Sequence, residues 1–281
     1  MTQENHDGRL RSIMILVTGA NGNLGSAILS ALHARGAAAV GGSRTPGSGM
    51  RRLDFDDPAG LDLAGVSTLV LVSAGYAEDD RVVARHAAVL DAAVRDGVGH
   101  VVYTSLTTAG DHLGFALAHR ATERAVRASG LPWTILRNGL YAELFGGLLM
   151  WDGDGVESAF GDGALAAVPR GDLAEAAAVV ASDPAPHVGR VLDLVGTPVT
   201  AGQVAAELGV PHRPIGLGEY RRRLLGTPGL LPFQPPMLVS IATGVRHGFL
   251  DGTAPDLAGL LGRTALDPLA AAVAAASAGR P

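Results

Sequence analysis

Short apolar runs punctuate the first half of the chain. Four of them are nearly uninterrupted: Ile13–Thr18, Thr68–Ser73, His100–Ser105 and Trp133–Arg137. Continuous runs of this length are typical of strands that are buried on both faces of a parallel sheet. Two weaker runs, which are less uniformly apolar, predict further strands at Ala37–Ser43 and Arg52–Phe55.

Amphipathic stretches separate these runs. The spacing of apolar positions predicts helices over Ser26–Arg35, Asp80–Arg95 and Phe115–Ser129. Strands that alternate with helices at this spacing predict an α/β fold, a Rossmann-like doubly wound parallel sheet.

The pattern loosens after about Tyr141. Asp172 with Glu175, and Thr200 with Gln203, have the spacing of helix N-caps with a capping residue. Val191–Val195 predicts another strand. The Pro- and Gly-rich stretch Pro211–Pro236 and the helices after it predict a small C-terminal lobe. The alanine-rich stretch Asp267–Ser277 fits an ordinary terminal helix.

Composition excludes several kinds of chemistry. The 281 residues contain no cysteine, so disulfides, zinc–thiolate sites, iron–sulfur clusters and a thiol nucleophile are excluded. All 22 basic residues are arginine. Without lysine the chain cannot form a Schiff base or use a Tyr/Lys proton relay. We expect no metal site.

Charge and hydropathy argue against two classes of binding partner, nucleic acids and membranes. The net charge is −5, and no basic cluster occurs beyond Arg221, Arg222 and Arg223, which argues against nucleic acid. The polar start does not resemble a signal peptide, and no apolar run reaches the ~18 residues that span a bilayer. We therefore expect a cytoplasmic protein with no membrane partner.

The stretch LVTGANGNLG carries the clearest chemistry. Its three glycines follow an apolar strand and open an amphipathic helix, the context in which such a loop binds a dinucleotide pyrophosphate. The alternative is a glycine turn without a ligand. We assign the loop to cofactor binding through Gly19, Asn21, Gly22, Asn23, Leu24 and Gly25.

The loop spacing Gly-x-x-Gly-x-x-Gly resembles atypical short-chain dehydrogenases/reductases. YTSL at Tyr103–Leu106, His119 with Glu123, and TILRNGLYAE at Thr134–Glu143 are similar to the NmrA-like branch. Within that branch they most resemble the type-2 NAD(P)H:quinone oxidoreductases. The resemblance extends through GDGALAAVPRGDLAEAAAVV and covers roughly residues 14–208.

The second predicted strand contains the residue that would select the cofactor. An acidic residue there normally binds the ribose 2′-hydroxyl of NAD, but this chain has Arg44 instead. An arginine can pair with a 2′-phosphate, which predicts NADP(H); the alternative is a solvated arginine. Asp54 and Phe55 resemble the family pair beside the adenine, or simply end a strand. Ser73 and Ala74 would pass beneath the cofactor.

The resemblance also locates the proton-transfer positions. Counting back from Glu123, the tyrosine and lysine of most short-chain reductases correspond to Phe115 and His119. Histidine has an ordinary pKa of about 6.5 and is a candidate proton donor near neutrality. The quinone-reducing relatives keep a histidine at this position, and a quinone needs orientation more than acid catalysis.

Several further features have more than one interpretation. Ser105 stands where the superfamily often has a catalytic serine; without a tyrosine partner we interpret it as a structural or ribose contact and assign it to cofactor binding. His86 is a packing residue or a site residue. Asn138 and Tyr141 follow a strand at the ligand-binding edge; Tyr141 would bond a substrate oxygen or pack in the core. Glu143–Trp151 would form a pocket wall or plain core. We assign catalysis to His119, Tyr141 and Asn138.

We therefore predict an NADPH-dependent oxidoreductase that reduces a quinone or quinone-like aromatic molecule. The alternatives are an NmrA-like redox sensor without turnover, a polyketide-tailoring reductase, or a lyase or isomerase. The predicted organisation is a disordered tail at 1–12, an NAD(P)-binding domain at 13–140, and at 141–281 a region that completes the sheet and forms the substrate lobe. A homodimer is one option for assembly.

Overall fold

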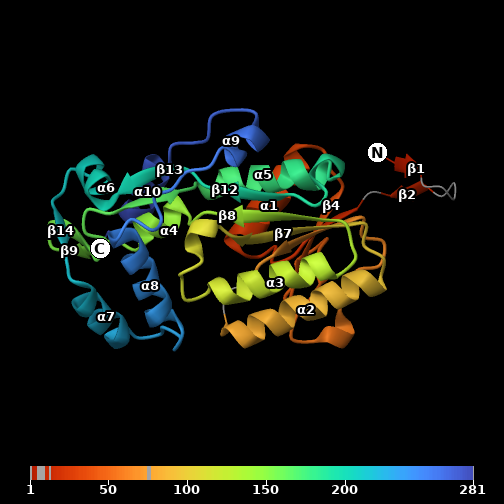
Figure 1. Cartoon of the computed structure of the whole chain (residues 1–281), viewed down its shortest axis with the longest axis horizontal. Helices are drawn as coiled ribbons and strands as arrows, with labels where there is room; N and C mark the ends of the chain where they lie inside the picture. The colour runs from red at the N-terminus through yellow and green to blue at the C-terminus, as the bar shows by residue number, and fades with distance from the viewer. Residues whose placement is uncertain (1, 5–9, 13, 75–76, 281) are drawn as a thin grey trace. The chain divides into compact units, whose positions relative to one another are not determined.

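The computed structural model describes residues 2–4, 10–12, 14–74 and 77–280. Seven strands of these residues form one sheet (Figure 1): β3 (Ile15–Val17), β4 (Ala39–Ser43), β5 (Arg51–Arg52), β6 (Thr68–Val72), β7 (His100–Leu106), β8 (Trp133–Asn138) and β12 (Val191–Leu194). Their order is β12-β8-β7-β6-β3-β4-β5, and β3 pairs in parallel with both β4 and β6. The predicted doubly wound α/β fold is confirmed.

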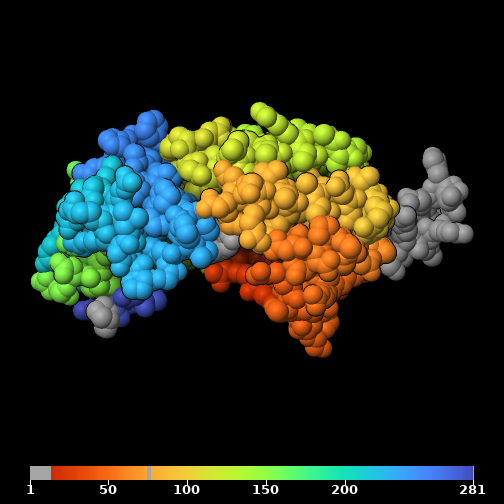
Figure 2. Space-filling view, turned by 90° about the horizontal axis from the view of Figure 1, so that it is seen from below, coloured from red at the N-terminus to blue at the C-terminus, as the bar shows by residue number. Residues whose placement is uncertain are grey.

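Helices cover both faces of this sheet. On one face α2 (Asp79–Arg95) and α3 (Ala116–Ala128) lie side by side (Figure 1 and Figure 2), and on the other lie α1 (Asn23–Ala34) and α5 (Arg170–Ser182). Since successive side chains of a strand point to opposite faces, Leu16 joins the core under α2 and α3, whereas Ile15 and Val17 face the other layer. All three are buried, which explains the uninterrupted apolar runs.

The order of strands reverses between β3 and β6. The chain leaves β3 toward β4 on one side and returns to β6 on the other. Ligands of such sheets bind outside the carboxyl ends of the strands at this switch point. The loop after β3 and the segment after β6 are therefore the places to look for a cofactor site.

The chain divides into two compact units. The first is formed by Met1–Ser105, Leu117–Arg137 and Leu173–Leu192, and the second by Leu106–Ala116, Asn138–Asp172 and Asp193–Pro281. The chain thus passes between the units at five peptide bonds. The predicted organisation, an NAD(P)-binding domain at 13–140 and a region with the substrate lobe at 141–281, stays a prediction.

Short elements build the second unit. Its strands are β9 (Met150–Asp152), β10 (Gly155–Ser158), β11 (Ala164–Ala167), β13 (Thr197–Thr200) and β14 (His212–Pro214). Its helices are α4 (Ala142–Gly147), α6 (Ala201–Glu207), α7 (Leu217–Gly226), α8 (Gln234–Arg246), α9 (Asp256–Leu261) and α10 (Pro268–Ala278). The second unit also contains the 3-10 turn η2 (Thr108–Gly110), whereas η1 (Pro58–Gly60) and η3 (Ala185–His187) belong to the first unit.

Two predicted helix starts have different outcomes. The capping box at Thr200 is present, with the Gln203 N–H bonded to the threonine hydroxyl and the Gln203 side chain bonded back. The N-cap predicted at Asp172 is wrong, because α5 begins at Arg170. The fully buried Asp172 carboxylate instead accepts hydrogen bonds from Arg263 (2.7 Å) and from the Leu266 N–H (2.6 Å). It is therefore a tertiary anchor within the second unit.

The stretch Glu143–Trp151 packs in the core of the second unit. Phe145 stacks on Phe160 with ring centroids 4.8 Å apart. A Cβ added to Gly146 would come within 2.0 Å of the Ala272 carbonyl oxygen, so the glycine permits close contact between α4 and α10. The core interpretation of this stretch is the one that the contacts support.

The N-terminal segment is described only in part. Residues 2–4 and 10–12 form the short antiparallel strands β1 (Thr2–Glu4) and β2 (Leu10–Ser12), while residues 1, 5–9 and 13 lie outside the described residues. The disordered tail at 1–12 stays a prediction. None of the helices in the described chain is both long and apolar enough to cross a membrane.

Candidate active site

The glycine loop joins the carboxyl end of β3 to the start of α1. Gly19 has φ +61°, a conformation that side chains other than glycine rarely adopt. Gly22 is the residue before the first turn of α1, and its N–H donates to the Gly19 carbonyl oxygen at 2.8 Å. A Cβ on Gly25 would lie 2.3 Å from the same oxygen. The first and third glycines are therefore required by the turn itself.

The start of α1 is suited to an anion. No side chain caps it, and no acidic residue lies in its first turn. The N–H groups of a first helical turn have no partner within the helix and carry partial positive charge. Gly22 has an ordinary φ of −85° and is exposed, so only its missing side chain distinguishes it from other residues. This end of α1 is an open donor site.

A second loop is fastened to the glycine loop. Asn21 Nδ2 donates to the Thr45 carbonyl oxygen at 2.9 Å, which links it to the segment after β4. The adjacent Arg44 is exposed and, within the described residues, forms no hydrogen bond or ion pair. A guanidinium held beside an anion site and free of carboxylates fits the predicted role of Arg44.

The strand register adds a residue that the sequence did not single out. In the parallel pair of β4 and β5, Arg52 lies directly opposite Ser43, the residue before Arg44. Arg52 is also exposed and has no partner among the described residues, whereas Arg51 donates to the Ala64 carbonyl oxygen. Arg44, one residue past the end of β4, and Arg52 in β5 are thus two guanidinium groups near the same end of neighbouring strands, both without partners among the described residues.

Asp54 and Phe55 follow β5 in a tight turn. Asp54 Oδ1 accepts the Asp56 N–H at 3.1 Å, so one carboxylate oxygen stabilises the turn. Phe55 is partly buried against the core of the first unit. Both residues have a structural role, and the exposed part of each is compatible with the predicted contact to an adenine.

A buried histidine holds the segment after β6. The Ala74 N–H donates to His86 Nε2 at 2.9 Å, so Nδ1 carries the proton in this arrangement and faces the Thr122 hydroxyl at 2.8 Å. Burial lowers the pKa of the His86 imidazole to about 3. His86 is therefore a neutral packing residue that positions Ala74. The neighbouring Ser73 Oγ is buried without a hydrogen-bond partner in the described chain.

His119 bonds to a tyrosine that the sequence did not single out. Tyr103, fully buried in β7, has its hydroxyl 3.0 Å from His119 Nδ1. Burial, reinforced by the nearby Arg120, lowers the pKa of His119 to about 4. The expected pKa near 6.5 is not met, and His119 is neutral at pH 7. Burial also raises the pKa of Tyr103 well above its ordinary value, so the phenol keeps its proton.

Ser105 belongs to a buried charge cluster. Its hydroxyl donates to Glu123 at 2.7 Å, and the same carboxylate accepts hydrogen bonds from Arg120, Arg127 and Arg137. Burial opposes ionisation of Glu123, but the bonds from Arg137 and Ser105 outweigh it and its pKa lies below the ordinary value. Because the Ser105 hydroxyl proton is already donated to Glu123, the structural interpretation of this residue is favoured.

Asn138 and Tyr141 lie in the second unit. Asn138 is 6% exposed and its Oδ1 is buried with no partner in the described residues. The Tyr141 ring lies under the Arg170 guanidinium, 5.2 Å from centroid to Cζ, and burial raises its pKa. The backbone N–H of Arg170 donates to Glu143, which completes a small polar cluster. Asn138 thus has an unused acceptor, which is rare for a buried side chain.

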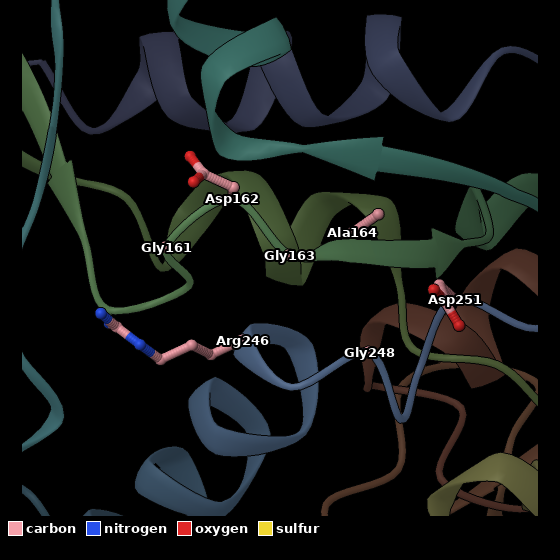
Figure 3. A pocket seen from close by; sticks show the side chains of 7 residues that line it. All are labelled: Gly161, Asp162, Gly163, Ala164, Arg246, Gly248 and Asp251. Carbon is pink, nitrogen blue, oxygen red and sulfur yellow. The ribbon is translucent and has the colours of Figure 1, made fainter.

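Two cavities open in the second unit. One, of about 520 Å³, is lined by Gly161–Ala164, Gly248, Asp251 and Arg246 (Figure 3). Arg246 donates hydrogen bonds to the carbonyl oxygens of Ala159 and Ile215, so its guanidinium links these two segments of the chain. The other cavity, of about 460 Å³, is lined partly by His112 and Arg221. No predicted site residue lines either cavity.

The predicted residues therefore fall into groups. The glycine loop, Arg44, Ser73, Ala74 and His119 belong to the first unit, and Asn138 and Tyr141 to the second. Arg52, Tyr103 and His112 were missed. A prediction of the pairing register between the second and third strands could have placed Arg52 beside Ser43. Tyr103 was quoted from the sequence only as part of the motif YTSL, and nothing in the sequence indicates that His112 lines a cavity. Among the described residues no group of His, Asp and Glu side chains is placed to hold a metal ion.

Comparison with known proteins identifies the family. Residues 19–184 match a family model described as NAD(P)H-binding. Quinone oxidoreductase 2 from Escherichia coli (strain K12) is 36% identical over 212 residues, covering 69% of this chain and 73% of that protein. The crystal structure of the same E. coli enzyme with NADPH has a TM-score of 0.80 at 30% identity, and covers 92% of this chain and 98% of that one.

Two further relatives are reductases. The (4-alkanoyl-5-oxo-2,5-dihydrofuran-3-yl)methyl phosphate reductase of Streptomyces griseus subsp. griseus is 31% identical over 279 residues, 90% of this chain and 94% of that protein. The triphenylmethane reductase of Citrobacter sp. in complex with NADP(H) has a TM-score of 0.82 at 28% identity, and covers 94% of this chain and all of that one.

The comparisons agree with the resemblance found in the sequence. The family match includes the glycine loop and extends through both α2 and α3. These relatives match between 69% and 94% of this chain, and each is a reductase or a quinone oxidoreductase. The chain therefore belongs to the NAD(P)H-binding family, in its NmrA-like branch, and is an NAD(P)H-dependent oxidoreductase.

Proposed function

We propose that this oxidoreductase uses NADPH to reduce a quinone or quinone-like aromatic molecule without a Tyr/Lys catalytic pair. The observation that carries the proposal is the state of His119. This residue stands where most short-chain reductases have a lysine, and burial holds its imidazole neutral at pH 7 with a pKa of about 4. A site without a cationic acid is suited to an acceptor that is already electrophilic.

The residues of the first unit fit NADPH. The open start of α1 offers backbone N–H groups to the pyrophosphate, and the glycine loop leaves room for it beside Gly22. Arg44 and Arg52, which have no partner among the residues that the structure describes, would hold the 2′-phosphate. Ser73, with its unpartnered hydroxyl, and Ala74 follow β6 at the switch point. These features support the preference for NADPH over NADH.

When bound, NADPH supplies a hydride, and one further proton taken up from water converts the quinone to a hydroquinone. His119 would act as a hydrogen-bond donor. Because the Tyr103 phenol keeps its proton, it donates to His119 Nδ1, and the imidazole then carries its own proton on Nε2. A fixed, neutral N–H of this kind orients a carbonyl oxygen and stabilises the charge that develops on it.

A second candidate acceptor is a conjugated lactone, as in a tailoring reductase. One observation favours this candidate: the sequence match to the S. griseus reductase spans 279 residues, compared with 212 for the E. coli enzyme, although the E. coli structure also matches 92% of this chain. A conjugated lactone accepts hydride at carbon. Like a quinone, it therefore has little need of a strong general acid in the site.

The decisive experiment is a panel of acceptors. Oxidation of NADPH is followed by its absorbance with quinones, conjugated lactones and simple aliphatic ketones. We expect turnover with quinones and little or none with ketones, since general acid catalysis is typically worth about 10²–10⁴-fold. His119→Ala should lower quinone reduction by no more than that range, and Tyr103→Phe by less.

The same panel separates the alternatives. Rapid reduction of plain ketones would mean that another group supplies a strong acid, and the proposal would be wrong. If NADPH bound tightly and no acceptor oxidised it, a sensor without turnover would be favoured. Turnover of lactones with none of quinones would select the second candidate.

A further inference from the structure

The cavity of about 460 Å³ in the second unit is built by two helices and one loop. Its apolar wall consists of Leu225 from α7 and of Pro235, Pro236 and Val239 from α8. A cavity of this size holds a molecule of one or two rings. The outer surface of α7 and α8 forms much of the light blue area in Figure 2.

A loop is fastened over α8 at this cavity. The Gly114 N–H donates to Ser240 Oγ at 3.2 Å, which holds the segment that contains His112. The His112 ring lies 5.0 Å from that of Phe249, and a Cβ on Gly244 would come within 2.7 Å of His112 Nε2. Gly244 therefore leaves the space that the histidine occupies.

The polar side chains that line the cavity differ in whether their N–H or O–H groups already donate a hydrogen bond within the protein. Ser240 donates its hydroxyl proton to the Met237 carbonyl oxygen, and Thr243 donates to the Val239 carbonyl oxygen, both at 2.7 Å. Proline has no N–H. Arg221 and His112 are the lining side chains with N–H groups that no described hydrogen bond uses. The cavity offers donors on one side and apolar contact on the other.

The charge of this cavity is unbalanced. None of its lining residues is acidic. On α7 the carboxylate of Glu219 pairs with Arg223, which leaves Arg221 without a counter-ion in the described chain. A guanidinium at the rim of an apolar cavity, with no carboxylate to neutralise it, favours an anionic group on the bound molecule.

We propose that this cavity binds a small molecule with an acidic substituent, a carboxylate or a phosphate: Arg221 binds the acidic group with help from His112, while the apolar wall holds the ring system of the molecule. The inference goes beyond the proposed function. Binding itself requires neither NADPH nor turnover, so the two can be tested separately.

The test uses three redox-inactive probes of nearly equal shape: 2-naphthoate, 2-naphthyl phosphate and the neutral 2-naphthamide. Their affinities for the full chain are measured by titration calorimetry. We expect at least one anion to bind about tenfold or more tightly than the amide, the size of one charge-assisted hydrogen bond. The anion that benefits distinguishes carboxylate from phosphate.

Matched variants assign the effect. Arg221→Ala should abolish the preference for the anion, whereas Arg222→Ala, one residue away on the same helix and outside the cavity lining, should keep it. His112→Phe keeps the ring contact with Phe249 and should lower anion affinity several-fold. Circular dichroism checks that each variant is folded.

Two results would overturn the inference: no preference for either anion in the unmodified chain, or a preference that survives Arg221→Ala. Failure of quinone reduction in the acceptor panel would leave this result untouched, because the probes are not reduced. An anion preference without quinone turnover would therefore reject the proposed reaction and keep the anion site.

Discussion

The two proposed binding sites, the glycine loop of the first unit and the cavity lined by α7 and α8 in the second, offer different kinds of groups to a ligand. The loop offers backbone N–H groups, and its specificity comes from residues that have no side chain, such as Gly22 and Gly25. The cavity offers side chains, chiefly Arg221 and His112, which are more than one hundred residues apart in the chain. Backbone recognition tolerates change elsewhere, whereas side-chain recognition changes with each substitution.

From this contrast we expect relatives to share the glycine loop more than the residues that line the cavity. A pyrophosphate presents the same shape in every enzyme of the family, so one local motif suffices for it. An acceptor differs from enzyme to enzyme and is held by side chains from several segments. We therefore expect the first unit to be similar throughout the family and the second unit to vary with the substrate.

The largest expected effect comes from filling the loop. Gly22 is exposed with an ordinary φ, so Gly22→Val strains only its contact with the Gly19 carbonyl oxygen, 3.2 Å from an added Cβ. The branched side chain would occupy the space beside the pyrophosphate, and we expect NADPH binding to be lost while the fold remains. Titration calorimetry and circular dichroism measure both. Normal NADPH affinity in a folded Gly22→Val chain would show that the phosphate site lies elsewhere.

Cofactor choice should depend on one or two side chains. We expect NADPH to bind roughly tenfold to a hundredfold more tightly than NADH, the worth of one or two charge-assisted bonds. Arg44→Ala should remove most of that difference, Arg52→Ala a smaller part, and the exposed Arg35 at the far end of α1 serves as a control. Dissociation constants for both cofactors decide the matter. Equal losses for NADPH and NADH would mean that Arg44 does not bind the 2′-phosphate.

Acid should destabilise the first unit through its buried histidines. His86 and His100 are 1% and 3% exposed, and burial lowers their pKa values to about 3 and about 4. In the unfolded chain each has a pKa of about 6.5. Below about pH 6.5 the unfolded state therefore binds protons that the folded state does not, and the free energy of unfolding falls as the pH decreases.

The expected loss is about 2 kcal/mol for each of these histidines between neutral pH and about pH 5. Urea denaturation at the two pH values measures it. His247→Gln, at an exposed position, should leave the dependence unchanged. A free energy of unfolding that stays constant across this range would contradict the burial argument.

The smallest expected effect tests a second-unit residue. Tyr141 has no hydrogen bond from its hydroxyl within the described chain, and its ring contact with Arg170 survives Tyr141→Phe. If the hydroxyl only positions an acceptor oxygen, KM should rise a few-fold with kcat nearly unchanged. Tyr220→Phe, buried in the same unit, is the control. A large fall in kcat would instead give Tyr141 a role in the chemical step.

Most of the fold was predictable because the sheet is buried on both faces. The helix α2 was predicted at Asp80–Arg95 and observed at Asp79–Arg95, and β8 was predicted within one residue of its end. The start of α1 was placed three residues late, because Asn23, Leu24 and Gly25 belong to the glycine motif and to the first helical turn at once. The N-cap expected at Asp172 did not form because its carboxylate accepts a hydrogen bond from Arg263, far along the chain.

The site was predictable only where it is local. The glycine motif and Arg44 lie within one strand–helix–strand unit, so spacing alone relates them. The bond between Tyr103 and His119, the neutral state of His119 and the unpaired charge of Arg221 depend on burial and on contacts between distant segments. Sequence periodicity carries no information about desolvation, and this is why the expected pKa of His119 was too high.

The five passages of the chain between its two units have a consequence for engineering. Since the second unit consists of three separate segments, two of them inserted between parts of the first, no single cut separates the units. Exchanging the second unit for that of a relative would require three simultaneous grafts with six matched junctions or chain ends. Natural variation of substrate is therefore expected to proceed by point substitution and loop change within this region, with the chain's connectivity preserved.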